Sequence, residues 1–161
     1  MILNAYGQSN FFKVIQTLMN SPFELYLTGS RFFGVNKPNS DYDFFVKDSP
    51  EVRAQLEHSG FSLLVDEDYK NDTSFAAIYV LYLDVEIIQV QVIKEDEFLI
   101  KKEAQDLLAS VYGDFRNTVV AAKMPEDKEA RKSLWEFAKA VVSNNTVIPN
   151  LQVTLGAREN Q

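Results

Sequence analysis

The sequence predicts a small α+β protein: a short mixed β-sheet flanked by helices, with a helical part at the C-terminus. Strand-like and helix-like segments alternate as far as about residue 93, and the pattern is helical from Asp96 onward. Hydrophobic residues make up 46% of the 161 positions, which is enough to bury a core. We expect a core over residues 1–93, a helical part of the same domain over 94–143 and a tail over 144–161.

The first part of the chain predicts a helix followed by two strands. Ser9 is placed to cap a helix that ends before Pro22. Its apolar residues recur at helical spacing and are Phe11, Phe12, Ile15, Leu18 and Met19. The segments that follow are a strand over 23–27, a loop or short helix over 30–40 and a strand over 41–46.

The next helix has the clearest boundaries in the sequence. Ser49 can accept a hydrogen bond as its cap, Pro50 suits the first helical position, and Gly60 ends a helix that runs to about His58. Beyond it we expect a strand over 61–65, an acidic loop over 66–72 and two strands within 75–90, with a turn near Tyr82. Helices are expected at roughly 97–112, 115–123 and 126–142.

Composition and charge exclude several classes of function. The chain has no cysteine, so disulfides, thiolate metal sites and cysteine nucleophiles are excluded. No signal peptide and no bilayer-length apolar run is present, which predicts a cytoplasmic protein without a membrane partner. The net charge of −7 disfavours long nucleic acid as a partner, because such binding depends on neutralising phosphates. The basic residues at 101–102 and within 123–132 are read as solvated helix faces.

A pair of aspartates on one strand is the main candidate for chemistry. Asp41 and Asp43 are two residues apart, so an extended chain points both carboxylates to the same face. Like charges this close imply a cation or a proton between them. Upstream, Gly29-Ser30 ends a predicted strand, where a glycine allows close approach of a phosphate and a hydroxyl can bond to it.

These residues resemble the signature of the DNA polymerase β-like nucleotidyltransferase superfamily. The matching segments are Leu27-Thr28-Gly29-Ser30-Arg31-Phe32-Phe33-Gly34 and Ser40-Asp41-Tyr42-Asp43-Phe44. The resemblance covers roughly residues 23–93, so the core over 1–93 is expected to be a nucleotidyltransferase catalytic core. Phe32-Phe33 departs from small family members, which often have alanine and a second arginine there, and this departure leaves the identity of the nucleotide open.

The resemblance implies a nucleotide-binding role for four residues. Gly29 and Ser30 would bind the triphosphate, with Ser40 beside the aspartates. Arg31 is also a candidate, because its planar guanidinium can donate to phosphate oxygens; the alternative is that it points into solvent.

The resemblance also implies a magnesium site, with manganese as an alternative ion. Asp41 and Asp43 would bind the metal, and a third carboxylate from a later strand would join them and assist the attacking hydroxyl. We assign the third role to Asp84, with Glu86 as its rival because parity puts both on the same strand face.

The expected activity is Mg²⁺-dependent transfer of a nucleoside monophosphate from a triphosphate such as ATP to a hydroxyl on a protein or a small molecule. One alternative is a nucleotide- or partner-binding module with this fold and no turnover. A second is a protein modifier of the kind found in toxin–antitoxin pairs.

Overall fold

The computed structural model describes residues 11–18, 20, 23–65, 74–112 and 124–147. Two compact units divide the chain, residues 1–98 and 99–161, and the boundary falls inside α4. A helix spans residues 11–18. The later elements are β1 (Tyr26–Thr28), α2 (Gly29–Phe32), β2 (Tyr42–Lys47), α3 (Pro50–His58), β3 (Ser62–Val65), β4 (Phe75–Tyr82), β5 (Ile87–Ile93), α4 (Glu95–Tyr112) and α5 (Lys128–Val147).

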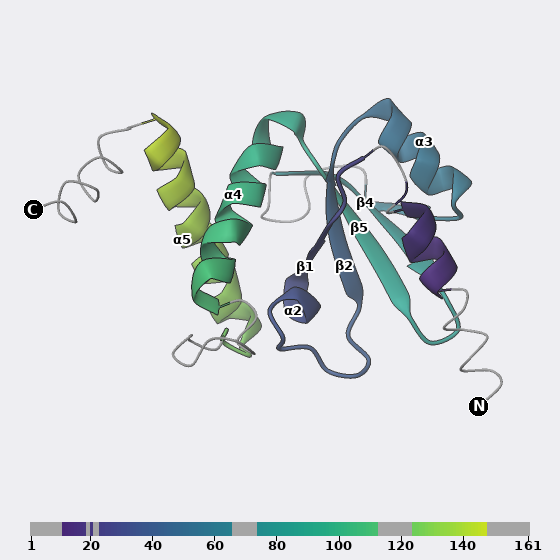
Figure 1. Ribbon diagram of the computed structural model, residues 1–161, viewed down its shortest axis with the longest axis horizontal. Coiled ribbons are helices and arrows are strands. Elements are labelled where there is room, and N and C mark those ends of the chain that lie inside the picture. The colour runs from purple at the N-terminus through teal and green to yellow at the C-terminus, as the bar shows by residue number, and fades with distance from the viewer. Residues whose placement is uncertain (1–10, 19, 21–22, 66–73, 113–123, 148–161) are drawn as a thin grey trace, which may run out of the picture. The chain divides into compact units, whose positions relative to one another are not determined.

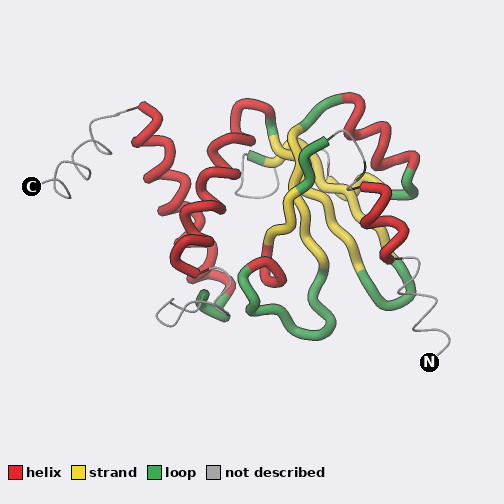
Figure 2. Tube along the Cα trace, in the orientation of Figure 1, coloured by secondary structure: helices red, strands yellow, loops and turns green. Residues whose placement is uncertain are grey.

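The first unit contains a five-stranded mixed sheet in the order β1-β2-β5-β4-β3 (Figure 1). β2 and β5 run parallel in the middle, and the other neighbouring strands are antiparallel. The expected α+β class and the mixed sheet flanked by helices are therefore confirmed. Because β2 and β5 are parallel, α2, the loop 33–41 and the β4–β5 turn lie at the same end of the sheet (Figure 2).

Alternate side chains of the sheet build two cores on its opposite faces. The Tyr42 face carries Phe44 and Val46 of β2, and it packs against Leu18 of the N-terminal helix and Leu56 of α3. That helix and α3 lie on the same side of the sheet (Figure 1). Further buried members of this core are Val52, Phe61, Ala77, Tyr79, Ile88, Val90 and Val92.

The Asp43 face carries a smaller aromatic core. Phe45 of β2 is fully buried there, in a cluster that also contains Ile78 and Ile93. The ring of Phe45 stacks on Tyr26 with centroids 5.2 Å apart, and Phe98 of the first turn of α4 packs 5.9 Å from it. Asp43, which lies on the same face, is half-buried.

The predicted start and end of α3 are confirmed by its capping. The Ser49 hydroxyl accepts a hydrogen bond from the Val52 amide at 3.1 Å, and Pro50 occupies the first turn. Gly60, with φ of +95°, follows the helix in the left-handed conformation that glycine allows. These three residues set the helix bounds by local chemistry alone.

In the second unit, α4 and α5 meet through a buried cation. The ammonium of Lys101, only 7% exposed, lies 4.3 Å from the centroid of the Trp135 ring. This contact places Lys101 in a partly apolar interior, whereas the sequence suggested a solvated basic face there. Within the described ranges, no helix is long and apolar enough to cross a membrane.

Several expected boundaries are corrected by the structure. β1 begins at Tyr26 rather than at Phe23, and β2 begins one residue after Asp41. The turn between β4 and β5 is at Asp84-Val85, so neither Asp84 nor Glu86 is within a strand. α5 continues to Val147, so residues 144–147 are helical rather than part of a tail. The expected cap at Ser9, the acidic loop 66–72, the helix at 115–123 and residues 148–161 lie outside the described residues.

Candidate functional site

The two halves of the predicted signature meet in space. β1 pairs with β2 in antiparallel fashion, and the register places Thr28 opposite Asp43. Gly29, the next residue, has φ of +75° and turns the chain into α2. A Cβ atom at Gly29 would lie 2.5 Å from the Asp43 Oδ2 atom, which is closer than such atoms can approach. Glycine is therefore required both by the turn and by the neighbouring carboxylate.

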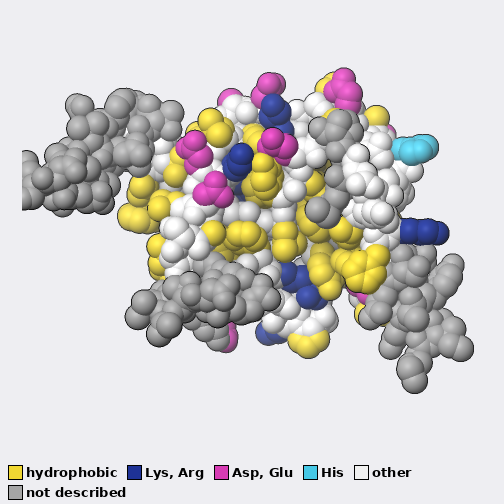
Figure 3. Space-filling model, in the orientation of Figure 1, with side chains coloured by type: hydrophobic (Ala, Val, Ile, Leu, Met, Phe, Trp, Pro, Cys, Tyr) yellow, Lys and Arg dark blue, Asp and Glu magenta, His cyan; other side chains and the backbone are white. Residues whose placement is uncertain are grey.

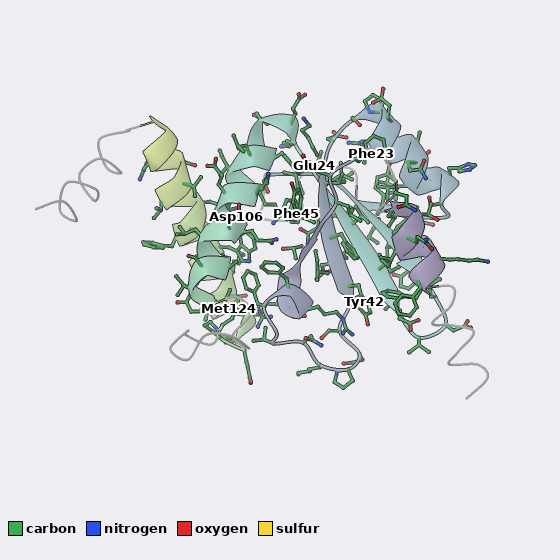
Figure 4. The ribbon with its side chains drawn as sticks, in the orientation of Figure 1. Phe23, Glu24, Tyr42, Phe45, Asp106 and Met124 are labelled. Carbon is green, nitrogen blue, oxygen red and sulfur yellow. The ribbon has the colours of Figure 1, made fainter. Side chains whose placement is uncertain are left out.

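Asp41 and Asp43 are placed at the start of β2. Asp43 is its second residue and Asp41 immediately precedes it, and both are half-buried. Alternation within β2 places Tyr42 and Asp43 on opposite faces of the sheet. In Figure 4, Tyr42 is near the start of β2 and Phe45 lies farther along the strand.

Arg31 binds the loop that joins the two halves of the motif. Its Nε and Nη2 atoms donate to the Ser40 carbonyl oxygen at 3.2 and 2.9 Å, and Nη2 also donates to the Pro38 carbonyl oxygen at 3.2 Å. The guanidinium carbon lies 3.8 Å from the centroid of the Tyr42 ring. Arg31 is thus engaged within the protein, instead of pointing freely into solvent.

Ser40 has a structural hydrogen bond of its own. Its hydroxyl accepts from the Lys37 amide at 2.8 Å, and its amide donates to the Lys37 carbonyl oxygen at 3.0 Å. These bonds close a turn directly before Asp41. Ser30 is half-buried in α2, and its carbonyl oxygen accepts from the Val35 amide at 2.9 Å.

The two aromatics that depart from the family pattern lie at the end of α2. Phe33 is only 2% exposed, and its ring meets that of Phe32 edge to face with centroids 4.8 Å apart. Phe32 is half-buried. One of the two rings therefore anchors the short helix in the interior, a role that alanine or arginine in the same place would not provide.

Asp84, expected as the third carboxylate, is exposed in the β4–β5 turn, outside the strands. The β2–β5 register instead places Gln89 opposite Asp43, on the same sheet face. By the same alternation Glu86, just before β5, belongs to the other face; its Oε2 atom is buried without a hydrogen-bond partner among the described residues. The structure thus brings Gly29 and Asp43 together, and it places Asp84 in an exposed turn.

The pair of carboxylates can be tested for its fit to a divalent cation. No group of three or more His, Cys, Asp or Glu side chains suited to a metal is present in the part of the chain that the structure describes. Magnesium, however, is commonly held by one or two carboxylates together with water and substrate phosphates. Asp41 and Asp43 supply the two carboxylates of that mode, and the Asp43 carboxylate occupies the space next to Gly29 that a side chain there would need.

A small hollow lies away from these residues. It is lined mostly by apolar side chains of the Tyr42 face, including Leu18, Val46 and Leu56. Such a lining makes it a packing defect of the core rather than a place for a charged ligand.

Sequence reasoning missed two residues of the region. Gln89 is opposite Asp43 only because of the β2–β5 register, which no local pattern encodes. Tyr42 was assigned simply to the opposite face, whereas it is the surface on which Arg31 stacks.

Comparisons of the chain with protein-family models, with curated proteins and with solved structures gave no significant match.

Proposed function

We propose that the protein is a nucleotidyltransferase that takes a nucleoside triphosphate with Mg²⁺ and transfers its nucleotidyl group to a hydroxyl acceptor. Gly29 and Ser30 would hold the phosphates, and Asp41 and Asp43 would hold the metal. The observation that carries the proposal is the contact between the two halves of the motif. Gly29 leaves room for the Asp43 carboxylate at 2.5 Å from where its own Cβ would be.

The physical reason is that this chemistry needs phosphate donors and carboxylates side by side. The Gly29-Ser30 turn offers backbone and hydroxyl donors, and β2 presents acidic oxygens next to it. When bound, the metal ion would neutralise charge on the phosphates during displacement of pyrophosphate. Without a cation, a triphosphate and two carboxylates would repel one another, so nucleotide binding should require the metal.

A second candidate, nucleotide binding without turnover, is favoured by one observation. The side chain opposite Asp43 on β5 is the amide of Gln89. An amide can accept a hydrogen bond, but it is too weakly basic to take a proton from an attacking hydroxyl. Turnover therefore requires the attacking hydroxyl to give its proton to a base other than Gln89.

The acceptor is proposed to be a protein or a small molecule, including the partner of a toxin–antitoxin pair. The chain has 23 acidic and 16 basic residues, and Figure 3 shows the Lys and Arg side chains scattered over the visible face rather than gathered in one stripe. A long nucleic acid would gain little from such a surface.

Calorimetry with ATP and with GTP, each with and without Mg²⁺, tests the binding site. We expect binding only when the metal is present, and loss of the metal-dependent part in Asp43→Asn. Asp48→Asn is the matched control, because Asp48 follows the other end of β2 and is paired with Arg53. Tight binding that persists in excess chelator, or equal effects of the two variants, would contradict the proposal.

Turnover is tested separately. The purified protein is incubated with triphosphates labelled at the α-phosphate, Mg²⁺ and cell extract, and the label is followed onto an acceptor. Label on a protein or small molecule, lost in Asp43→Asn, supports the transferase. Metal-dependent binding without any transfer supports the second candidate instead.

A further inference from the structure

The loop between the two halves of the motif is tied to α2 at both of its ends. Near its start, the Val35 amide donates to the Ser30 carbonyl oxygen at 2.9 Å. At its end, the Arg31 guanidinium holds the carbonyl oxygens of Pro38 and Ser40 at 2.9–3.2 Å. The next residue is Asp41, so the second attachment is adjacent to one of the two proposed metal ligands.

The Arg31 guanidinium makes contacts both at its edge and on its planar face. Its edge donates to the loop carbonyls, and its carbon atom is 3.8 Å from the Tyr42 ring centroid. The Tyr42 ring in turn packs on Phe11 of the N-terminal helix, with centroids 4.5 Å apart. Since Tyr42 points to the opposite face from Asp43, Arg31 is stacked on the side away from that carboxylate.

We propose that Arg31 is a positioning residue for the metal site, rather than a phosphate ligand. By holding the Ser40 carbonyl, Arg31 fixes the backbone directly before Asp41, one of the two proposed metal ligands. This inference rests on the proposed function, because it assigns Arg31 a part in the same site. Arginine suits the task because its fixed fork of donors bonds two carbonyls while its plane stacks on a ring, which a lysine ammonium cannot do.

The affinity for Mn²⁺ distinguishes two possible roles of Arg31, because electrostatics predicts opposite changes for them when Arg31 is replaced. If Arg31 acts only through its charge, its removal takes a cation away from the metal site, and Mn²⁺ should bind as tightly as before or more tightly. If Arg31 positions Asp41, its removal loosens a ligand, and Mn²⁺ should bind more weakly. Outer residues that orient metal ligands typically contribute about tenfold or more to metal affinity.

The experiment measures binding of Mn²⁺ alone, without nucleotide, by electron paramagnetic resonance. Wild type is compared with Arg31→Gln, which removes the charge, and Arg31→Lys, which keeps the charge but loses the fork. We expect both variants to bind Mn²⁺ about tenfold more weakly. Arg53→Gln is the matched control, because Arg53 is engaged with Asp48 at the other end of β2, and it should leave Mn²⁺ binding unchanged. Unchanged or tighter binding in Arg31→Gln, or full rescue by Arg31→Lys, overturns the proposal.

Amide hydrogen exchange separates failure of this inference from failure of the proposed function. The amides of Val35, Lys37 and Ser40 donate within the loop region, so their exchange reports whether it stays closed. Faster exchange in both Arg31 variants, with thermal unfolding shifted little, is the result expected. If wild type binds no Mn²⁺ at all, the metal site of the proposed function fails. Faster exchange would then still show that Arg31 holds the loop, and unchanged exchange would overturn that too.

Discussion

The two ends of β2 both have aspartates and an arginine nearby, yet the arginines are used differently. After Lys47, the Asp48 carboxylate receives a two-pronged contact from Arg53, with Nε–Oδ1 at 2.9 Å and Nη2–Oδ2 at 3.2 Å. At the Tyr42 end, Arg31 binds backbone carbonyls and an aromatic ring. One arginine neutralises a carboxylate, and the other fixes a loop.

This difference separates a structural acid from candidate functional acids. Asp48 gains a charge-assisted bond in the folded state, so its carboxylate stabilises the fold. Asp41 and Asp43 are two residues apart at the start of β2, and neighbouring carboxylates repel each other unless a cation or proton is bound. The proposed function would give these two acids a role in binding a metal ion.

The largest effect is expected where glycine meets Asp43. Gly29→Ala should lower the free energy of unfolding by about 2–4 kcal/mol, because it adds the cost of a left-handed φ to an overlap with the carboxylate. Gly34→Ala is the control: its φ of +73° is nearly the same, but nothing lies within 4 Å of its Cβ position. It should cost only about 1–2 kcal/mol. If urea denaturation gave equal losses of unfolding free energy for the two variants, overlap with Asp43 would contribute nothing to the cost of Gly29→Ala.

The next effect tests the structural acid. Asp48→Asn should destabilise the protein by about 1 kcal/mol, since the side chains of the pair are only 28–30% exposed and the contact is two-pronged. A double-mutant cycle with Arg53→Met isolates the pair, with an expected coupling of about 0.5–1 kcal/mol that decreases with salt. A coupling energy of zero would show that the contact with Arg53 does not stabilise the fold, and the contrast between Asp48 and Asp41 would then fail.

A smaller effect is expected at alkaline pH from Tyr79, whose hydroxyl donates to Glu57 of α3. Burial raises the pKa of Tyr79 from 10.0, opposed by Arg53 and reinforced by Glu57, whose carboxylate accepts from the Tyr79 hydroxyl at 3.4 Å. The folded state therefore keeps its proton to higher pH than the unfolded chain. This contribution to stability is full below the unfolded pKa and is lost as pH rises through the folded one. Tyr79→Phe should reduce the fall in denaturation midpoint above about pH 10. The same fall in both proteins would contradict this.

The smallest effect is expected at Asp41, and it compares the acids at the two ends of β2 most directly. Asp41→Asn should change the free energy of unfolding by less than about 0.5 kcal/mol, or slightly increase it, because it removes one of two like charges. Chemical denaturation beside Asp48→Asn measures the difference between the acids. A loss as large as that of Asp48→Asn would mean that Asp41 is a structural acid as well.

Local chemistry was readable from the sequence wherever a few neighbouring residues decide the conformation. The Ser49-Pro50 start of α3 and its end before Gly60 depend on capping and on backbone preferences within single turns. The expectation that Asp41 and Asp43 share one face uses only the two-residue period of an extended chain, and it stays a prediction for Asp41, which precedes β2. The α+β class followed from the order of such segments.

Errors arose where a boundary shifted by a residue or two. The sequence placed Asp84 on a strand, whereas the structure ends β4 at Tyr82 and turns at Asp84-Val85. The segment from Phe75 to Leu83 is apolar throughout, so no polar residue within it marks where β4 ends. In such a run a shift of one residue moves every side chain to the other face.

The sequence by itself therefore determined the order of the elements, the caps of α3 and the glycine turn at the end of β1. Only the tertiary structure decided that Gly29 touches Asp43, that Gln89 is opposite it, and that Arg31 lies on Tyr42. The physical reason is that these three facts depend on strand register and on a ring brought beneath a guanidinium. Register is set by how both faces of the sheet pack at once, and no single segment of the chain contains that information.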